Sequence, residues 1–272
     1  MSSPLAELFP DGEHRFHLTL RRAEPRAWFA HQDTTGRVLA ERRRWLQAEP
    51  SRYAALLPEA RPLLDEFAEV CRVSGYGDSI HAFGARLEPD VLLLSSDAAR
   101  ADAGEMRLLG GALCFPTGWA LEEKLGQPLD VIHGVVPGLN PAIGASIRQL
   151  LAHLKPGIAF CRDNWGLAAT DELNLHPSRH LPPPAPPVAM DRLWLRVEHQ
   201  ALVALPRSGG IAFGIRIALH RLDEVARDPT ASAGLAHALA TMPPALAAYK
   251  RIDRVHEDVT RLLSTGSPSA AS

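Results

Sequence analysis

Residues 193–219 read LWLRVEHQALVALPRSGGIAFGIRIAL, in which two runs of alternating apolar side chains flank the short segment Pro206-Arg207-Ser208-Gly209. Alternation over this length is typical of half-buried β-strands. A proline and a glycine between two such runs indicate a tight reversal of the chain. The stretch therefore predicts a β-hairpin, and with it an antiparallel sheet.

The two faces of this hairpin differ in polarity. One face of the first strand collects Leu195, Val197, His199, Ala201 and Val203, and the other collects Arg196, Glu198 and Gln200. If the turn centres near Ser208, Arg216 of the second strand lies across from Gln200 and diagonal to Glu198. Two interpretations remain open: a polar pocket formed by Arg216, Glu198 and Gln200, or a solvated sheet face.

Further strands and helices are indicated before and after the hairpin. Alternation and short apolar runs predict strands at 14–20, 90–96 and 107–115. Helical spacing of apolar residues predicts helices within 36–72 with a break near Glu49-Pro50, at 119–125, from Pro141 to Leu154, and from Pro243 onward. The run PPPAPP (182–187) is expected to be extended. A hairpin flanked by helices predicts an α+β fold.

Composition argues against several classes of protein. The formal net charge is −2, and the longest run of like charges, Arg42-Arg43-Arg44, is interpreted as a solvated helix face. A nucleic-acid or anionic-membrane partner would usually need a larger basic patch. Three widely spaced cysteines indicate neither a disulfide framework nor a zinc site. No signal peptide or membrane span is recognised, so the protein is expected to be soluble and cytoplasmic.

Common catalytic signatures are absent, and one histidine draws attention instead. The sequence has no GxGxxG, GxxxxGK[ST], GxSxG or HExxH motif, which argues against a self-contained dehydrogenase, nucleotide hydrolase, serine hydrolase or zinc peptidase. His133 stands between the apolar Val131-Ile132 and a turn marked by Gly134 and Pro137-Gly138. What remains is a cofactor held by a lone ligand, or a binding function without chemistry.

Three segments carry a resemblance to a known family. They are LCFPTGWALEEKLGQPLDVIHGVVPG (113–138), CRDNWGL (161–167) and LRVEHQALVALPRSGGIAFGIR (195–216). In these segments the chain resembles the haem-dependent oxidative N-demethylase alpha-subunit family. The resemblance implies a PAS-like antiparallel sheet flanked by helices that binds haem b in one domain, 1–272. The family likeness covers 14–225, a helical part follows at 226–264, and a disordered tail is expected at 265–272.

The resemblance also implies roles for individual residues. His133 is the expected axial ligand of the haem iron, presented from a stiff turn, with His199 and then Cys114 or Cys161 as rivals. Arg162 and Arg216 are expected to bind the haem propionates, although Arg216 has the alternative of a cross-strand pair with Glu198. Asn164, Trp165 and Glu198 are the expected catalytic residues: Asn164 beside bound oxygen, Trp165 at the porphyrin or the ammonium group, and Glu198 as receiver of the amine cation.

Two positions depart from the family pattern. The family usually has arginine where this chain has His199, which makes His199 a further candidate for contact with the cofactor. It usually has threonine where this chain has Gly214.

The implied reaction is oxidative N-demethylation of a small secondary amine such as dimethylamine to a primary amine and formaldehyde. Oxygen would be activated at ferrous haem, and electrons would come from NADPH through FMN and an iron–sulfur cluster carried by a partner reductase subunit. Two alternatives stay open: a haem-binding PAS-like sensor, and a binding protein without haem.

Overall fold

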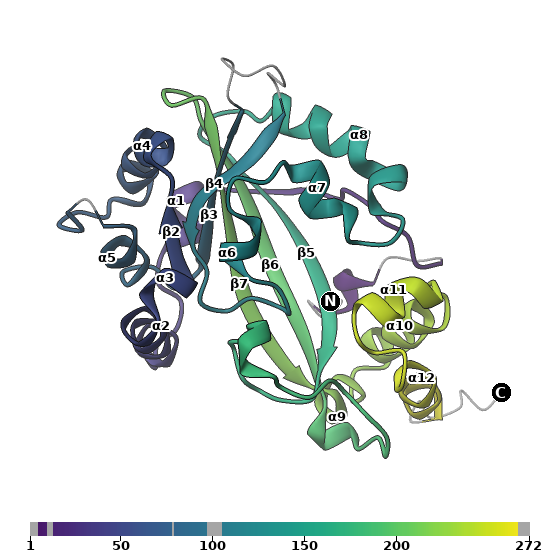
Figure 1. Ribbon diagram of the computed structural model, residues 1–272. Coiled ribbons are helices and arrows are strands. Elements are labelled where there is room, and N and C mark those ends of the chain that lie inside the picture. Colours follow the sequence, from purple (N-terminus) through teal and green to yellow (C-terminus); the bar gives the residue numbers. More distant parts are fainter. Residues whose placement is uncertain (1–4, 10–12, 78, 97–104, 266–272) are drawn as a thin grey trace.

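The computed structural model describes residues 5–9, 13–77, 79–96 and 105–265 (Figure 1). Within them the strands form one seven-stranded antiparallel sheet in the order β1-β5-β6-β7-β3-β4-β2. The strands are β1 (Arg21–Ala23), β2 (Ala54–Leu56), β3 (Asp90–Ser96), β4 (Met106–Ala112), β5 (Ala159–Ala168), β6 (Trp194–Leu205) and β7 (Gly210–Arg221). Helices flank this sheet, which confirms the predicted α+β fold.

The helices gather in groups that follow the order of the chain (Figure 1). The first group comprises α1 (Pro25–Phe29), α2 (Arg37–Ala48), α3 (Pro50–Tyr53), α4 (Arg61–Cys71) and α5 (Ile80–Gly84). The second comprises α6 (Leu121–Lys124), α7 (Leu129–Gly134) and α8 (Leu139–Ala152). The third comprises α9 (Leu222–Val225), α10 (Pro229–Ala240), α11 (Pro244–Tyr249) and α12 (His256–Thr265). Short 3-10 turns lie at Ala6–Leu8, Pro58–Ala60, Pro177–Arg179 and Met190–Arg192.

The predicted hairpin is confirmed, but its predicted register is wrong by one residue. Leu205 pairs with Gly210, and His199, not Gln200, lies opposite Arg216. The loop Pro206–Gly209 has an even number of residues, so its centre falls between Arg207 and Ser208 and not on Ser208. A one-residue shift moves a side chain to the other face of a sheet. Arg216 is therefore on the face opposite Glu198 and Gln200.

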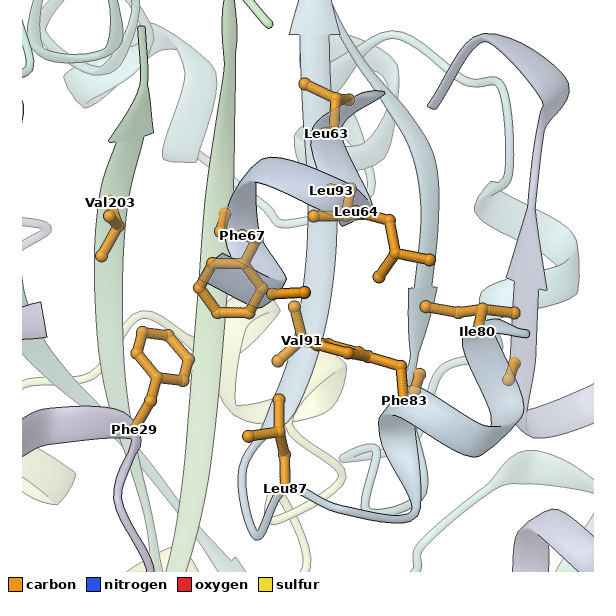
Figure 2. Close-up of a cluster of buried hydrophobic side chains, with 14 of the residues drawn as sticks. Phe29, Leu63, Leu64, Phe67, Ile80, Phe83, Leu87, Val91, Leu93 and Val203 are labelled. Carbon is orange, nitrogen blue, oxygen red and sulfur yellow. The ribbon is translucent and has the colours of Figure 1, made fainter. Parts of the chain in front are cut away.

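Each face of the sheet is buried under a different group of helices. On the face that carries Leu93 and Val203, α1, α4 and α5 contribute Phe29, Phe67 and Phe83 to one core (Figure 2). On the opposite face, Leu92, Leu202 and Ile211 pack against side chains of α6, α7 and α8. The third group of helices packs around Leu195 and Val197 near the far end of β6. Helices therefore cover both faces of the sheet.

Several sequence-based boundaries differ from the structure. The segment 14–20, predicted to be a strand, is irregular, and the strand β1 begins only at Arg21. His133 lies on the helix α7 and not in a turn; the turn comes later, at the left-handed Gly138 that precedes α8. The single helix predicted from Pro243 is two helices, because Arg251 adopts a left-handed conformation that ends α11. Of the predicted tail, Thr265 ends α12 and residues 266–272 lie outside the described residues.

Arg42 corrects the interpretation of the arginine triplet as a solvated face. Its side chain is fully buried, and its guanidinium donates hydrogen bonds to Asp90 Oδ1 at 2.5 Å, Gly84 O at 2.7 Å and Ala112 O at 2.9 Å. Asp90, also fully buried, accepts hydrogen bonds from the backbone N–H groups of Cys114 and Phe115. A single buried ion pair therefore joins α2 to β3 and to the end of β4.

Replacing Arg42 tests this anchor against its neighbour in the sequence. We expect Arg42→Met to lower the free energy of unfolding by about 3–5 kcal/mol, because it leaves the Asp90 carboxylate buried without its cation. The matched control Arg43→Met should change it by less than about 0.5 kcal/mol, since Arg43 is exposed and, within the described ranges, its side chain donates only to Ala85 O. Urea denaturation followed by circular dichroism measures both. Equal losses in the two variants would contradict the assignment.

Candidate functional site

A cavity lies along the outer edge of β5, beyond the point where the pairing of β5 with β1 ends. β1 pairs with β5 only as far as Cys161, so from Arg162 onward this edge has no strand partner among the described residues. The cavity holds about 330 Å³ and is lined by residues of α7 and α8, of α10 and α11, and of the irregular segment 13–18 (Figure 1). Ligand sites commonly have volumes of roughly 300–1,000 Å³.

The lining of this first cavity is divided by polarity. Its apolar part comes mainly from α8 and the sheet and includes Leu139, Ile147, Leu150, Leu202 and Phe213. Its polar part includes His14, His17, Arg162, Asn164 and Lys250. Such a lining suits a ligand that has a broad apolar body and an anionic end.

His133 contributes its imidazole to the first cavity from the helix α7. The residue is half-buried, and its ring makes no hydrogen bond to any part of the chain that the structure describes. Burial lowers the pKa of His133, and the nearby charges of Arg162 and Lys124 lower it further against the opposing effect of Asp130. The ring is therefore neutral near pH 7, which is the form that binds a metal ion.

Arg162 places a guanidinium in the same cavity. Over the described ranges, no side chain or carbonyl forms a hydrogen bond or ion pair with this group. Burial lowers the pKa of Arg162, although Glu198 and Asp163 act in the opposite direction. A half-buried cation without a partner is costly unless an anion completes it. Arg162 is thus suited to a carboxylate.

A second cavity, of about 550 Å³, lies further along the same edge of β5. It is lined by Thr117 and Trp119, by part of the loop 175–184, and by Glu198 of β6. The two cavities share four lining residues: Asn164, Trp165, Tyr249 and Lys250. The two cavities are therefore neighbours.

Glu198 is the carboxylate of the second cavity, and three neutral donors hold it in place. Thr117 Oγ1 donates to Oε1 at 2.6 Å, while the amides of Gln200 and Asn164 donate to Oε2 at 2.9 and 3.2 Å. Thr117 Oγ1 in turn accepts a hydrogen bond from Arg196 Nε at 2.9 Å. A carboxylate offers about four acceptor positions. One position on Glu198 therefore remains for a ligand.

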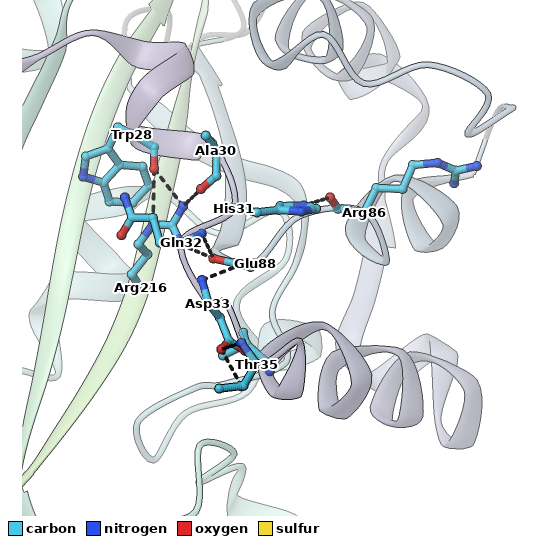
Figure 3. A network of polar contacts seen from close by, with 10 residues as sticks. Trp28, Ala30, His31, Gln32, Asp33, Thr35, Arg86, Glu88 and Arg216 are labelled. Carbon is cyan, nitrogen blue, oxygen red and sulfur yellow. Dashed lines mark hydrogen bonds and ion pairs between the residues drawn. The ribbon is translucent and has the colours of Figure 1, made fainter.

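His199 and Arg216 line neither cavity. The His199 ring contacts Asp163 Oδ1 at 2.7 Å, and Arg216 pairs with Glu88 at 2.8 Å and donates to the carbonyl oxygen of Trp28 (Figure 3). The predicted gathering of Arg216 with Glu198 and Gln200 is wrong, for the reason of register given above. Expected roles of His199 and Arg216 at the cofactor therefore have no support in the geometry.

The two cysteines that were alternatives to His133 are also absent from the linings of the cavities. Cys114 and Cys161 are buried, and neither lines the first or the second cavity. Burial raises the pKa of both thiols, that of Cys114 to about 12. Iron binds cysteine as the thiolate, which these environments disfavour.

Sequence reasoning missed three residues of the site. Lys250, Thr117 and Arg196 all line the second cavity, and Lys250 lines the first as well. Thr117 lies within a segment that carried the family resemblance, and Arg196 lies within another such segment, two positions before Glu198 on the same strand face. Only these neighbours in the sequence could have pointed to them. Lys250 has no such signal, because it follows a helix that reads as ordinary packing.

Two properties of the described residues bear on the class of protein. None of the helices there is long and apolar enough to cross a membrane. The same residues contain no group of three or more histidine, cysteine, aspartate or glutamate side chains placed to hold a metal ion. A haem iron is held by the porphyrin and an axial side chain, so its site need not contain such a group.

Fold and cavity together define the class: an α+β protein whose amphipathic cavity is lined by imidazole and guanidinium groups, among them His133 and Arg162. The comparison with protein families then gives the particular family. A family described as haem-dependent oxidative N-demethylase, alpha subunit-like, matches residues 73–260, which is more than half of the chain. The chain belongs to this family, as the resemblance predicted. The description names haem as the cofactor, and "alpha subunit" indicates an enzyme of several subunits.

The residues of the first cavity fit a haem. A haem needs an axial nitrogen, an apolar slot and cations for its two propionates. His133 offers a neutral ring nitrogen, the side chains of α8 and the sheet form the apolar part, and Arg162 offers an unpaired cation. Of the residues that line the cavity, only Glu13 and Asp163 carry a negative charge that would repel the propionates. Asp163 is already paired with His199 and Arg21.

Gly214, one of the two departures from the family pattern, has a local cause. A Cβ atom at this position would lie 2.5 Å from ring atoms of both Trp28 and Phe29. Those two rings come from α1, which Arg216 fastens to the sheet through the Trp28 and Ala30 carbonyls (Figure 3). Because α1 packs directly on the strand here, glycine is required in this chain.

Restoring the family residue at this position should destabilise the protein. We expect Gly214→Thr to lower the free energy of unfolding by about 1–3 kcal/mol, since the added atoms must displace two aromatic rings. Gly166→Ala is the control on β5, two strands away in the sheet, because a Cβ there meets nothing within 4 Å. Thermal unfolding measures the difference. A Gly214→Thr protein as stable as the Gly166→Ala protein would refute this account of the departure.

Proposed function

We propose that the protein binds haem b in the first cavity and oxidatively demethylates a small secondary amine, of the size of dimethylamine, that enters from the second. His133 is the proposed axial ligand, and Arg162 the proposed partner of a propionate. The observation that carries the proposal is the presence of an unbonded neutral imidazole and an unpaired guanidinium in one amphipathic cavity. Membership of the family supports the cofactor and the reaction class.

The overall reaction fixes what the chain must supply. A dimethylammonium ion, one O₂, two electrons and two protons give methylammonium, formaldehyde and one water. Bound haem supplies the activation of oxygen and the oxidation of the methyl carbon. The electrons are proposed to come from NADPH through FMN and an iron–sulfur cluster on a partner reductase subunit. The chain itself must bind the amine and direct one methyl group toward the first cavity.

Glu198 is the proposed receiver of the amine cation. Its carboxylate is buried, forms no ion pair within the described residues, and keeps one acceptor position for a donor. Asn164 connects this position to the first cavity, because its amide donates to Glu198 Oε2 while its side chain lines both cavities. Trp165 lies on the same wall and can attract the ammonium group through its ring.

Hemin titration tests the proposed ligand. Wild-type protein should bind hemin and give a Soret band of a histidine-bound haem, and His133→Ala should lose that band or bind at least about tenfold more weakly, since the role would then have to pass to His14 or His17, the other lining histidines, which lie in the segment 13–18. His153→Ala, at an exposed histidine on the adjoining loop, is the matched control. An unchanged spectrum in His133→Ala would transfer the role to another residue. A wild-type protein that does not bind hemin would favour a binding protein without haem.

Formaldehyde release tests the proposed reaction. Haem-loaded protein given dimethylamine, NADPH and a flavin/iron–sulfur reductase should release formaldehyde. Glu198→Gln should lower kcat/KM by about 10- to 100-fold, the effect of losing one charged hydrogen bond. Glu69→Gln, at an exposed carboxylate paired only with Arg207 in the structure, should not. Absence of turnover with any small methylamine in haem-loaded wild type would favour a haem-binding sensor.

A further inference from the structure

Two opposite charges line the second cavity without meeting each other. Glu198 reaches it from β6, and Lys250 reaches it from the C-terminal end of α11. No ion pair joins them in the part of the chain that the structure describes, yet the Glu198 carboxylate is close enough to act on the Lys250 charge. The cavity therefore has an acceptor and a donor set apart from each other on its wall.

Among the described residues, Lys250 is held by a single hydrogen bond that leaves most of its donors unused. Its Nζ donates to the backbone carbonyl of Trp165 at 2.6 Å and lies 5.6 Å from the centre of the Trp165 ring. An ammonium group has three N–H donors. Two of them are therefore directed elsewhere, at a position where the side chain borders both cavities.

The charge of Lys250 has a cost that an anion would offset. Burial, together with the nearby charge of Arg162, lowers the pKa of Lys250 to about 8 against the opposing effect of Glu198. The ammonium form still dominates at pH 7. A buried cation without an anionic partner is unfavourable, so a bound carboxylate would be stabilised at this position.

The other cations of the second cavity are not available for this task. Arg196 is buried and donates to four oxygen atoms: Thr117 Oγ1 and the carbonyls of Phe115, Glu172 and Leu173. Arg162 lines only the first cavity. Arg251 lies at the exposed rim. Lys250 is thus the cation that faces Glu198 across the cavity.

The size of the cavity also exceeds what the smallest amines require. Dimethylamine has three non-hydrogen atoms, whereas the second cavity holds about 550 Å³. Aromatic side chains, Trp119 and Tyr249, contribute to its wall. A larger amine would fill this space better and exclude more water.

We propose that the second cavity binds a zwitterionic secondary amine, an N-methyl amino acid, with its ammonium group on Glu198 and its carboxylate on Lys250. This deepens the proposed demethylation and rests on it for the chemistry that follows binding. An N-methyl amino acid, O₂, two electrons and two protons give the free amino acid, formaldehyde and water. The methyl carbon is oxidised, its bond to nitrogen breaks, and the electrons come from the reductase already named.

Two isosteric amines separate recognition of the carboxylate from recognition of the amine. Sarcosine is N-methylglycine, and N-methylisobutylamine has the same non-hydrogen skeleton with an isopropyl group in place of the carboxylate. Calorimetric titration of haem-loaded wild type should show tighter binding of sarcosine. In Lys250→Met the ratio of the two dissociation constants should shift against sarcosine by about tenfold or more, the effect of one charge-assisted hydrogen bond. Lys155→Met, at an exposed lysine, should keep the wild-type ratio.

The opposite results would overturn this inference without touching the proposed function. Wild type that binds N-methylisobutylamine as tightly as sarcosine, or a ratio that Lys250→Met leaves unchanged, excludes a carboxylate site at Lys250. Hemin affinity of Lys250→Met is measured in parallel: a loss confined to hemin assigns Lys250 to a propionate instead. Because binding is read directly, the result stands even if formaldehyde release fails, in which case only the proposed reaction is refuted.

Discussion

The buried ion pair between Arg42 and Asp90 is the constraint on which the rest of the structure depends. Each charge has lost its water, and the pair is stable because further hydrogen bonds complete both groups. Asp90 stands at the first position of β3 and binds the N–H groups of Cys114 and Phe115. The chain is therefore fixed in direction as it leaves β4, before it crosses toward the site.

This constraint reaches the candidate site through Phe115. Arg196 donates to the Phe115 carbonyl and to Thr117 Oγ1, and Thr117 donates to Glu198. The position of the Glu198 carboxylate thus depends on a relay of hydrogen bonds that begins at Asp90. The Arg196 guanidinium also offsets the charge of Glu198. Burial lowers the pKa of Arg196 to about 10, and the negative charges of Glu198 and Asp90 oppose that decrease because they attract the guanidinium. The Glu198 carboxylate can therefore remain buried although it forms no ion pair among the described residues.

Patterns within one segment were predictable from the sequence, whereas contacts between segments were not. Strand β3 has the predicted bounds, and Leu150 and Leu151 of α8 pack on the sheet as the helical spacing indicated, while Ile147 is buried. The register of the hairpin was predicted wrongly, because a shift of one residue in the centre of the loop decides on which face of the sheet Arg216 lies. Arg42 was misjudged since nothing beside it in the chain reveals the carboxylate that buries it. His133 was identified through resemblance, and Lys250 was missed because no local pattern marks it.

The polar second half of β5 explains both why this strand was not predicted and why the cavities lie beside it. Its sequence, AFCRDNWGLA, lacks apolar alternation over its second half, because Arg162, Asn164 and Gly166 face a site and not a core. That half also has no strand partner on its outer side in the described residues, and an open edge must be covered by something other than a strand. Here the cover is made of helix ends and the irregular segment 13–18, which cannot pack on a strand as closely as another strand would. The space left between them forms the two cavities, which polar residues of β5 line.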